Sequence, residues 1–484
     1  MPGAKDSASA SARVRLRPLV IAACLIAIIG AAAAFRLLGL NWDSGQHLHP
    51  DERFIIMVDT AIRWPSSVGQ YFDSAHSPLN PYNRGFSNFV YGTLPLFLLK
   101  AVASLIHRDS YDGALLVGRA LSALSDLGSV LLLYLAGRRL YRTEIGLLAA
   151  ALLGLSVLGI QLSHFMAVDT FTVFFLMLSF YFSTRLIDGG GWKSAAAMGF
   201  SFGLALACKL SIALAPLLMV TAIGLRLYQR WPRGRYAESP SSDGQPPEQH
   251  DGDGSASPGV RPETPFRSPA GETLLNGVWM LLIALAAAFI AFRLFQPYAF
   301  SGPVTLSPKW LQDEQQQRAF IAGTADVPFL LQWAHTTPFI FPIKDIVVWG
   351  MGWPLGLLCF SGLAAAAVRI FRQAELEHLP AVLWVLANLL YLGAQQSKTM
   401  RYFYQLYPFL ALLSAWLVFS VAHHQRGLRA GEDAHPTGWR AGEDAHPTGW
   451  RAGEDAHPTV PFARFRAAKR LNWGLLLGSF GLAS

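Results

Sequence analysis

The sequence predicts an all-α protein that crosses a membrane many times. Of its 484 residues, 52% are hydrophobic and only 14% are charged, whereas soluble proteins average about 25% charged residues. Long apolar runs recur along the chain, and arginines cluster beside them, for example in residues 13–17 and 137–144. Arginines beside membrane helices set the orientation of those helices. The net charge of +8 is therefore explained by membrane topology, and nucleic acid is not an expected partner.

The apolar runs predict a bundle of about ten or eleven membrane-spanning helices. The first run, residues 18–40, is long enough to cross about 30 Å of hydrocarbon. It is longer than the core of about 7–15 residues expected of a cleaved signal peptide. The run 195–228 is too long for one crossing and has Lys209 in its middle, so two short spans are expected to meet there. The other expected spans are 115–136, 145–163, 169–187, 273–295, 343–370, 379–396 and 403–421.

The segments between the spans indicate two membrane modules. Residues 18–228, with a first external loop at 41–114, form an N-terminal module that is expected to hold the catalytic residues. Residues 273–421, with an external loop at 296–342, form the second module. Residues 229–272 lie between the modules, are rich in Pro, Gly, Ser and acids, and have no apolar period. This composition predicts a disordered cytoplasmic loop.

The first external loop is expected to carry amphipathic helices at the membrane interface. Residues 41–114 mix charges and prolines with short amphipathic pieces. In the piece 86–106, Pro95 and Lys100 interrupt an otherwise apolar stretch. This piece is therefore a poor spanning helix and is expected to lie on the membrane surface.

The terminal segments are expected to flank the bundle on its cytoplasmic side. The arginines of residues 1–17 assign the N-terminus to the cytoplasm. Residues 422–471 are predicted to form a cytoplasmic loop that contains a tandem repeat, RAGEDAHPTGW. Its recurring Asp and His could bind a metal, but duplication within a solvated loop is the better interpretation. Residues 472–484 look like the start of a span that is cut short, which predicts a missing C-terminal part.

Acidic side chains are concentrated at the external ends of two spans. The stretch WDSGQHLHPDERF, residues 42–54, carries three acids, two histidines and an arginine directly after the first span. It contains Asp51 and Glu52, and Asp169 lies at the head of the fourth expected span. These acids could meet in one cavity just above the bilayer, where a carboxylate could deprotonate an acceptor hydroxyl. For each acid alone, a solvated loop residue is the alternative interpretation.

Cations placed near the same membrane face complement these acids. Lys209, Lys398 and Arg401 occupy positions that are costly unless each cation faces an anion or water. A phosphate at the membrane surface would be a suitable partner, since lysine acts as a point charge and arginine as a bidentate fork. Snorkelling of the long side chains to lipid headgroups is the alternative. Arg53 and Tyr402 are added as candidate phosphate or substrate contacts because they neighbour these groups.

A metal or nucleotide site is not favoured by the sequence. His47 and His49 lie beside Asp51 and Glu52 at ligand-like spacing, so a divalent metal is a candidate there. The sequence has no second cluster of metal-ligand residues at a fixed spacing, so this metal is not favoured. No other cofactor is indicated. The chain has no Walker pattern and no GxGxxG fingerprint, so a nucleotide-linked donor is not indicated.

Six segments carry a resemblance to a known family. They are HPDERF, FVYGTLPLFLLKA, GRALSALSDLGSVLLLYLAGRRLY, LSHFMAVDTFTVFF, GLALACKLSIALAPLL and KTMRYFYQLYPFLALLSA, spread over about residues 18–421. In their order and topology they resemble the polyprenyl-phosphate-dependent glycosyltransferases of the GT-C fold. This group includes the protein O-mannosyltransferases and aminoarabinose transferases and is often called the family-39 group.

The resemblance implies both an activity and roles for the candidate residues. It implies a GT-C-like bundle that transfers a hexosyl or pentosyl group from a polyprenyl-phosphate carrier to an acceptor hydroxyl of a protein, lipid or glycan. The catalytic base would be Asp51 or Glu52 in the first external loop, with Asp169 as a second acid of the site. Lys209 and Arg401 match the cations that hold the carrier phosphate. The site would face the external, periplasmic side of the plasma (inner) membrane.

Two other functions remain open from the sequence. A transporter or flippase for a lipid-linked or anionic substrate could use the same cations without chemistry. Such proteins show internal repeats and broken helices near the membrane midplane, whereas no repeat is evident among the spans and the acids lie outside them. An inactive scaffold subunit is the third interpretation, because the sequence stops abruptly in what looks like a span. The long cytoplasmic loop, the repeat and the abrupt end also depart from the family pattern.

Overall fold

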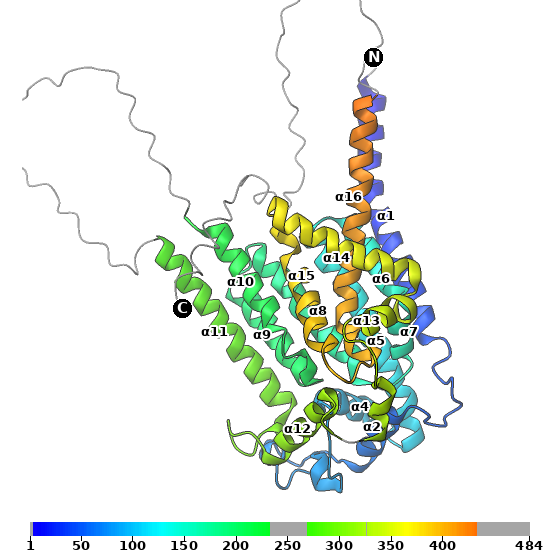
Figure 1. The fold of residues 1–484 in the computed structure, drawn as a ribbon, viewed down its shortest axis with the longest axis vertical. Helices are drawn as coiled ribbons and strands as arrows, with labels where there is room; N and C mark the ends of the chain where they lie inside the picture. The colour runs from blue at the N-terminus through cyan, green and yellow to red at the C-terminus, as the bar shows by residue number, and fades with distance from the viewer. Residues whose placement is uncertain (1–2, 233–268, 326, 433–484) are drawn as a thin grey trace, which may run out of the picture.

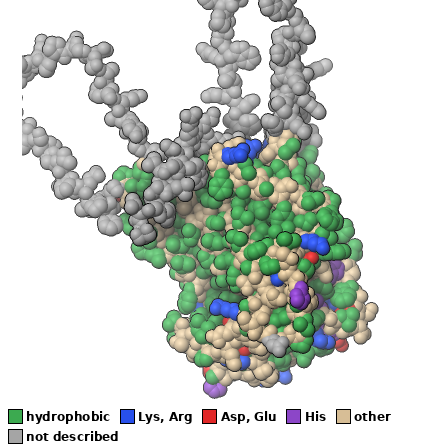
Figure 2. All heavy atoms as spheres, viewed as in Figure 1, with side chains coloured by type: hydrophobic (Ala, Val, Ile, Leu, Met, Phe, Trp, Pro, Cys, Tyr) green, Lys and Arg blue, Asp and Glu red, His purple; other side chains and the backbone are tan. Residues whose placement is uncertain are grey.

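Long helices lie side by side and form the body of the molecule (Figure 1). The computed structural model describes residues 3–232, 269–325 and 327–432, and within these ranges the regular structure is helical apart from one isolated bridge. The shorter helices α2 (Pro50–Ala61), α4 (Thr93–Leu105) and α12 (Pro308–Ala322) gather at one end of the bundle. We call this end the loop end. Figure 2 shows a broad hydrophobic surface above it, as expected of a bundle surrounded by lipid.

Eight helical segments of the described chain are long and apolar enough to cross a membrane. A ninth crossing is formed if α6 (Thr143–Gly154) and α7 (Val157–Ser163), which are bent by 60°, count as one span. The expected all-helical membrane bundle is confirmed, but a count of ten or eleven helices is not. The eight spans are Pro18–Leu37 of α1 (Gly3–Leu37), α5 (Tyr111–Leu140), α8 (Val168–Ile187), Leu210–Arg230 with α10 (Pro216–Arg230), α11 (Pro269–Phe295), α14 (Trp353–Gln373), Leu376–Gly393 with α15 (Leu379–Gly393), and Met400–Ala422 with α16 (Tyr407–Glu432).

The long apolar run 195–228 breaks at Lys209. Helix α9 (Trp192–Leu206) ends before it, and a short 3₁₀ turn precedes α10 after it. The break leaves backbone groups without helical hydrogen-bond partners. The loop before α4 supplies one such partner, because the Gly92 N–H donates to the Cys208 carbonyl at 3.0 Å. A Cβ at Gly92 would lie 2.0 Å from the Ala207 carbonyl oxygen, so only glycine permits this close approach.

Helix α4 packs inside the loop end, and most of its residues are buried. Its Pro95 lies in the first turn, where a missing N–H removes no intrahelical hydrogen bond. Its Lys100 is also buried, and the ammonium donates to the backbone carbonyl of Asp59 at 2.9 Å. The two residues that argue against a spanning helix thus fit a short helix held between α2 and α5.

Several predicted segments lie wholly or partly outside the described residues. Residues 233–268 of the predicted cytoplasmic loop do so, as does the stretch from residue 433 onward, which holds most of the tandem repeat and residues 472–484. Residues 269–272 begin α11, and residues 422–432 continue α16. Helix therefore extends into both predicted loops at these borders.

Candidate active site

Four of the predicted site residues meet at the loop end and form two ion pairs. Asp51 lies in the first turn of α2, Asp169 in the first turn of α8, Lys209 at the break before α10, and Arg401 in the 3₁₀ turn before α16. Arg401 Nη1 donates to Asp51 Oδ2, and Lys209 Nζ donates to Asp169 Oδ1 at 2.6 Å. We call these four residues the acid–base cluster.

The local sequence explains how Asp51 reaches the cluster. Pro50 occupies the first position of α2, and the His49 ring caps the helix by accepting the Glu52 N–H at 3.3 Å. Proline and a capping acceptor are favoured at these positions. The acids that follow are favoured by the helix dipole. The order His-Pro-Asp-Glu therefore fixes where the helix begins and holds Asp51 at its first turn.

The two ion pairs act as one electrostatic network. Arg401 interacts with Asp169 as well as with Asp51, and Lys209 also acts on Asp51. Burial by itself raises the pKa of Asp51, but the Arg401 guanidinium and then His49 and Lys209 outweigh it. The pKa of Asp51 therefore lies below its ordinary value, and the carboxylate is ionised at neutral pH.

Aromatic side chains line the same cluster. Lys209 Nζ lies 4.5 Å from the centre of the Tyr402 ring. Burial, together with the negative charge of the Asp51 carboxylate, raises the pKa of Tyr91. The His49 ring stacks on Phe165 at 4.3 Å between ring centres. Aromatic faces beside a charged cluster are suited to contact sugar rings or a cationic partner.

Glu52 occupies a different environment from its neighbour Asp51. It is fully buried, and Arg119 binds it in bidentate fashion, with Nε to Oε1 at 2.9 Å and Nη2 to Oε2 at 2.7 Å. The Met166 N–H donates to the same carboxylate at 2.8 Å. Arg119 also binds both oxygens of Asp43, at 3.0 and 2.9 Å. We call Arg119, Asp43 and Glu52 the Arg119 network.

A second buried network supports the turn that carries Arg401. Arg36 Nε donates to Asp126 Oδ2 at 2.6 Å, and Arg36 Nη1 donates to the Gly154 carbonyl at 2.6 Å. The Tyr404 hydroxyl donates to the other oxygen of Asp126. These contacts tie α1, α5 and the bend after α6 to the turn before α16. We call Arg36, Asp126 and Tyr404 the Asp126 network.

Sequence reasoning missed several residues of the cluster's surroundings and of the buried networks that support it. Arg36 and Asp126 are charges within predicted spans, which is itself a signal of a special role. Tyr91 lies within FVYGTLPLFLLKA, a segment that carried the family resemblance, but no pattern singled it out. Its approach to Asp51 depends on the contact between Gly92 and Cys208, which lie far apart in sequence.

Among the described residues, the remaining predicted cations make no hydrogen bond or ion pair with the acid–base cluster. Lys398 is buried, and its ammonium donates to Thr336 Oγ1 at 3.1 Å and to the Gln396 carbonyl at 3.3 Å. Burial lowers the pKa of Lys398. Arg53 lies on α2 with its side chain exposed. Tyr402 contacts Lys209, as described above.

The two histidines considered as metal ligands have other partners. His47 Nε2 lies 3.2 Å from Asp112 Oδ1, and its ring stacks on Tyr111. His49 caps α2. Among the described residues, one group of three ligand-type side chains lies close together, Glu375, Glu377 and His378. Both ring nitrogens of His378 already have hydrogen-bond partners there, so the group is explained as a buried hydrogen-bonded cluster.

Comparison with known proteins supports the family resemblance. Residues 94–237 match the sequence model of the family described as dolichyl-phosphate-mannose-protein mannosyltransferase. No curated protein matches the chain. The Archaeoglobus fulgidus oligosaccharyltransferase, in a crystal structure tethered to an acceptor peptide, is 14% identical with a TM-score of 0.50 and covers 86% of this chain. ArnT from Cupriavidus metallidurans, bound to undecaprenyl phosphate, is 13% identical with a TM-score of 0.46 and covers 81% of this chain.

The matched structures are longer than this chain. The match covers 52% of the oligosaccharyltransferase and 59% of ArnT, so this chain spans little more than half of their length. Fold similarity at this level of identity concerns architecture, since one fold can host several functions. The chain thus has the GT-C fold that its sequence predicted, and its residues 94–237 match the dolichyl-phosphate-mannose-protein mannosyltransferase family.

Proposed function

We propose that the protein is a membrane glycosyltransferase that moves a sugar from a polyprenyl-phosphate carrier to an acceptor hydroxyl. The observation that carries this proposal is the acid–base cluster, which brings two carboxylates and two cations from four elements to one end of a membrane bundle. The match of residues 94–237 to a family named for a dolichyl-phosphate sugar donor supports the donor class. A transporter is not favoured, because the family that residues 94–237 match is named for the transfer of a sugar.

Arg401 and Lys209 are proposed to bind the carrier phosphate. Arginine binds phosphate oxygens through a planar fork, and lysine contributes a compact charge. Negative charge grows on the phosphate as its bond to the anomeric carbon breaks. Cations that are already in place stabilise that charge more in the transition state than in the bound donor. Lys398 and Arg53 are proposed as further contacts to the donor.

Asp51 is proposed as the catalytic base. Its carboxylate is paired with Arg401. A phosphate that takes over the Arg401 fork would remove this partner, and burial would then raise the pKa of Asp51 and strengthen it as a base. Asp51 would accept the proton of the acceptor hydroxyl while the oxygen attacks the anomeric carbon. Asp169 is proposed to hold Lys209 in position.

The cluster is proposed to lie at the external, periplasmic face of the plasma (inner) membrane, with the N-terminus in the cytoplasm. Arg139 near the end of α5 and Arg230 at the end of α10 support this orientation. Each lies at the far end of a span that begins at the loop end. Cytoplasmic flanks are enriched in such arginines. The acceptor is a protein, lipid or glycan hydroxyl.

Transfer of labelled sugar from a polyprenyl-phosphate donor tests the proposal. Asp51→Asn is expected to lower the rate at least about a hundredfold, the usual contribution of a positioned base. Asp73→Asn is the matched control, because Asp73 is an exposed acid of the same loop that pairs with the nearby His76. Asp51→Asn with the activity of the unmutated protein would refute the assignment. In liposomes, donor flux without turnover would favour a transporter instead.

A further inference from the structure

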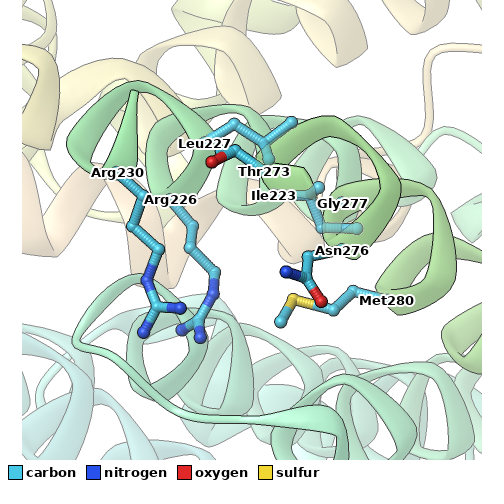
Figure 3. Close-up of a pocket in the computed structure, with 8 residues that line it drawn as sticks. All are labelled: Ile223, Arg226, Leu227, Arg230, Thr273, Asn276, Gly277 and Met280. Carbon is cyan, nitrogen blue, oxygen red and sulfur yellow. The ribbon is translucent and has the colours of Figure 1, made fainter. Parts of the chain in front are cut away.

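A small pocket lies between α10 and α11 at the end of the bundle opposite the acid–base cluster (Figure 3). Lys209 directly precedes the span Leu210–Arg230, and a helical segment of this length rises about 30 Å. The pocket is formed at the far end of that span. Its polar lining consists of Arg226 and Arg230 from α10 and of Thr273 and Asn276 from α11.

The pocket contains two arginines that have no acidic partner among the described residues. Arg226 is only 4% exposed, and its Nη1 donates to the carbonyl of Leu186 near the end of α8 at 2.7 Å. Asp188, which lies close to that carbonyl in sequence, pairs instead with Arg139 at 2.5 Å. Figure 3 shows the Arg226 and Arg230 guanidinium groups pointing in the same direction. Two neighbouring cations without an acid repel each other and favour an anion between them.

The volume of the pocket and the hydrogen-bond donor that Asn276 offers in it indicate what kind of anion fits. The cavity has a volume of about 50 Å³. One water needs about 10–15 Å³ on this scale, so the space suits a group of a few heavy atoms and excludes a nucleotide or a sugar chain. The exposed amide of Asn276 makes no hydrogen bond to another described residue and is free to donate. Guanidinium groups with an amide donor match the oxygens of a phosphate.

The surroundings of the pocket indicate a lipid as the source of the phosphate. On α11, beside the pocket, Leu274, Val278 and Trp279 are 48%, 54% and 62% exposed. Exposed apolar side chains on a membrane helix face hydrocarbon, and Trp is enriched at the level of the headgroups. We propose that this pocket binds the phosphate of an anionic phospholipid in the leaflet opposite the acid–base cluster. Arg226 and Arg230 bind the phosphate oxygens, and the acyl chains lie along the apolar face of α11.

Native mass spectrometry of the full chain purified in detergent tests this proposal. The probes are phosphatidylglycerol, diacylglycerol without a phosphate, and inorganic phosphate. The unmutated protein is expected to retain phosphatidylglycerol in preference to diacylglycerol. Arg230→Gln is expected to weaken that retention about tenfold, and Asn276→Leu about fivefold, from the strength of charged and neutral hydrogen bonds. Arg230 and Asn276 are exposed, so neither change should prevent folding.

Arg185→Gln is the matched control, because Arg185 is an exposed arginine in the last turn of α8 and does not line the pocket. It removes the same charge and is expected to leave retention unchanged. Equal losses in Arg185→Gln and Arg230→Gln would overturn the proposal, since general surface charge would then explain the binding. Retention of diacylglycerol equal to that of phosphatidylglycerol, or binding of inorganic phosphate alone, would also overturn it.

Discussion

Replacing Arg119 by Met is expected to destabilise the folded protein by about 5 kcal/mol. The guanidinium pairs with Asp43 and Glu52, and all three side chains are 0% exposed. Removing one partner of a buried ion pair costs about 3–5 kcal/mol, because the other charge stays buried and unpaired. Two carboxylates lose their cation in this variant, which places the expected cost at the upper end of that range.

The variant should also weaken the dependence of stability on acidic pH. Hydrogen bonds from Arg119 outweigh burial and lower the pKa of Asp43 from 3.8 to about 2. A depressed pKa contributes stability above the unfolded value, which is lost as pH falls from about 4 towards 2. At about 1.4 kcal/mol per unit, the contribution is about 2–3 kcal/mol. Without Arg119, the backbone N–H groups of Gly45 and Leu48 still hydrogen-bond to Asp43 and oppose the effect of burial on its pKa, so most of this loss between pH 4 and pH 2 should disappear.

Thermal unfolding of the detergent-purified protein, followed at pH 7 and pH 3, measures both effects. Arg119→Met should lower the midpoint clearly at pH 7, and its difference from the unmutated protein should narrow at pH 3. Arg53→Met removes an exposed cation from the same end of the molecule and should change the midpoint little, since exposed charges contribute at most about 1 kcal/mol. A midpoint for Arg119→Met within the error of Arg53→Met would refute the reasoning.

Two further predictions concern the cluster and the loop beside it. Arg401→Lys keeps the positive charge but loses the two-pronged guanidinium. The KM for the lipid-linked donor should therefore rise about tenfold or more in the transfer assay. An unchanged KM would show that Arg401 does not bind the donor. Gly92→Ala would place a Cβ 2.0 Å from the Ala207 carbonyl and should cost about 1–3 kcal/mol in thermal unfolding. Gly69→Ala, whose nearest contact is 3.8 Å away, is its control, and equal midpoints would contradict the prediction.

The membrane bundle was predictable because hydrophobicity along the chain reports each span directly. The helix count was not, because it depends on where a run breaks. Helix α9 covers only 15 residues, or about 23 Å, less than the hydrocarbon thickness of about 30 Å. Within the run 343–370, Gly352 has a φ of +82°, which interrupts the helix and leaves α14 alone as the span. Such breaks depend on contacts that periodicity does not contain.

The candidate site shows the same division between local and tertiary information. Sequence placed Asp51 and Glu52 together, but adjacent residues on a helix point about 100° apart. One therefore faces the cluster, while the other faces Arg119. Arg119 and Asp126 both lie within an expected span, and their partners come from other parts of the chain. The cost of burying a charge in a membrane predicts that each has a partner, but identifying that partner requires the fold.

The difference in burial between the ion pairs supports their different proposed roles. The side chains of the Arg119 network and of the pair between Arg36 and Asp126 are 0% exposed, so an incoming phosphate cannot reach them without local unfolding. Arg401 and Asp51 are 28% and 18% exposed. A buried network anchors the backbone next to each of these residues. Glu52, which follows Asp51 directly, belongs to the Arg119 network, and Tyr404, three residues after Arg401, belongs to the Asp126 network. The backbone on both sides is thus fixed, while the pair between them is accessible. This is the arrangement required if Arg401 is to exchange Asp51 for a phosphate without moving the helices.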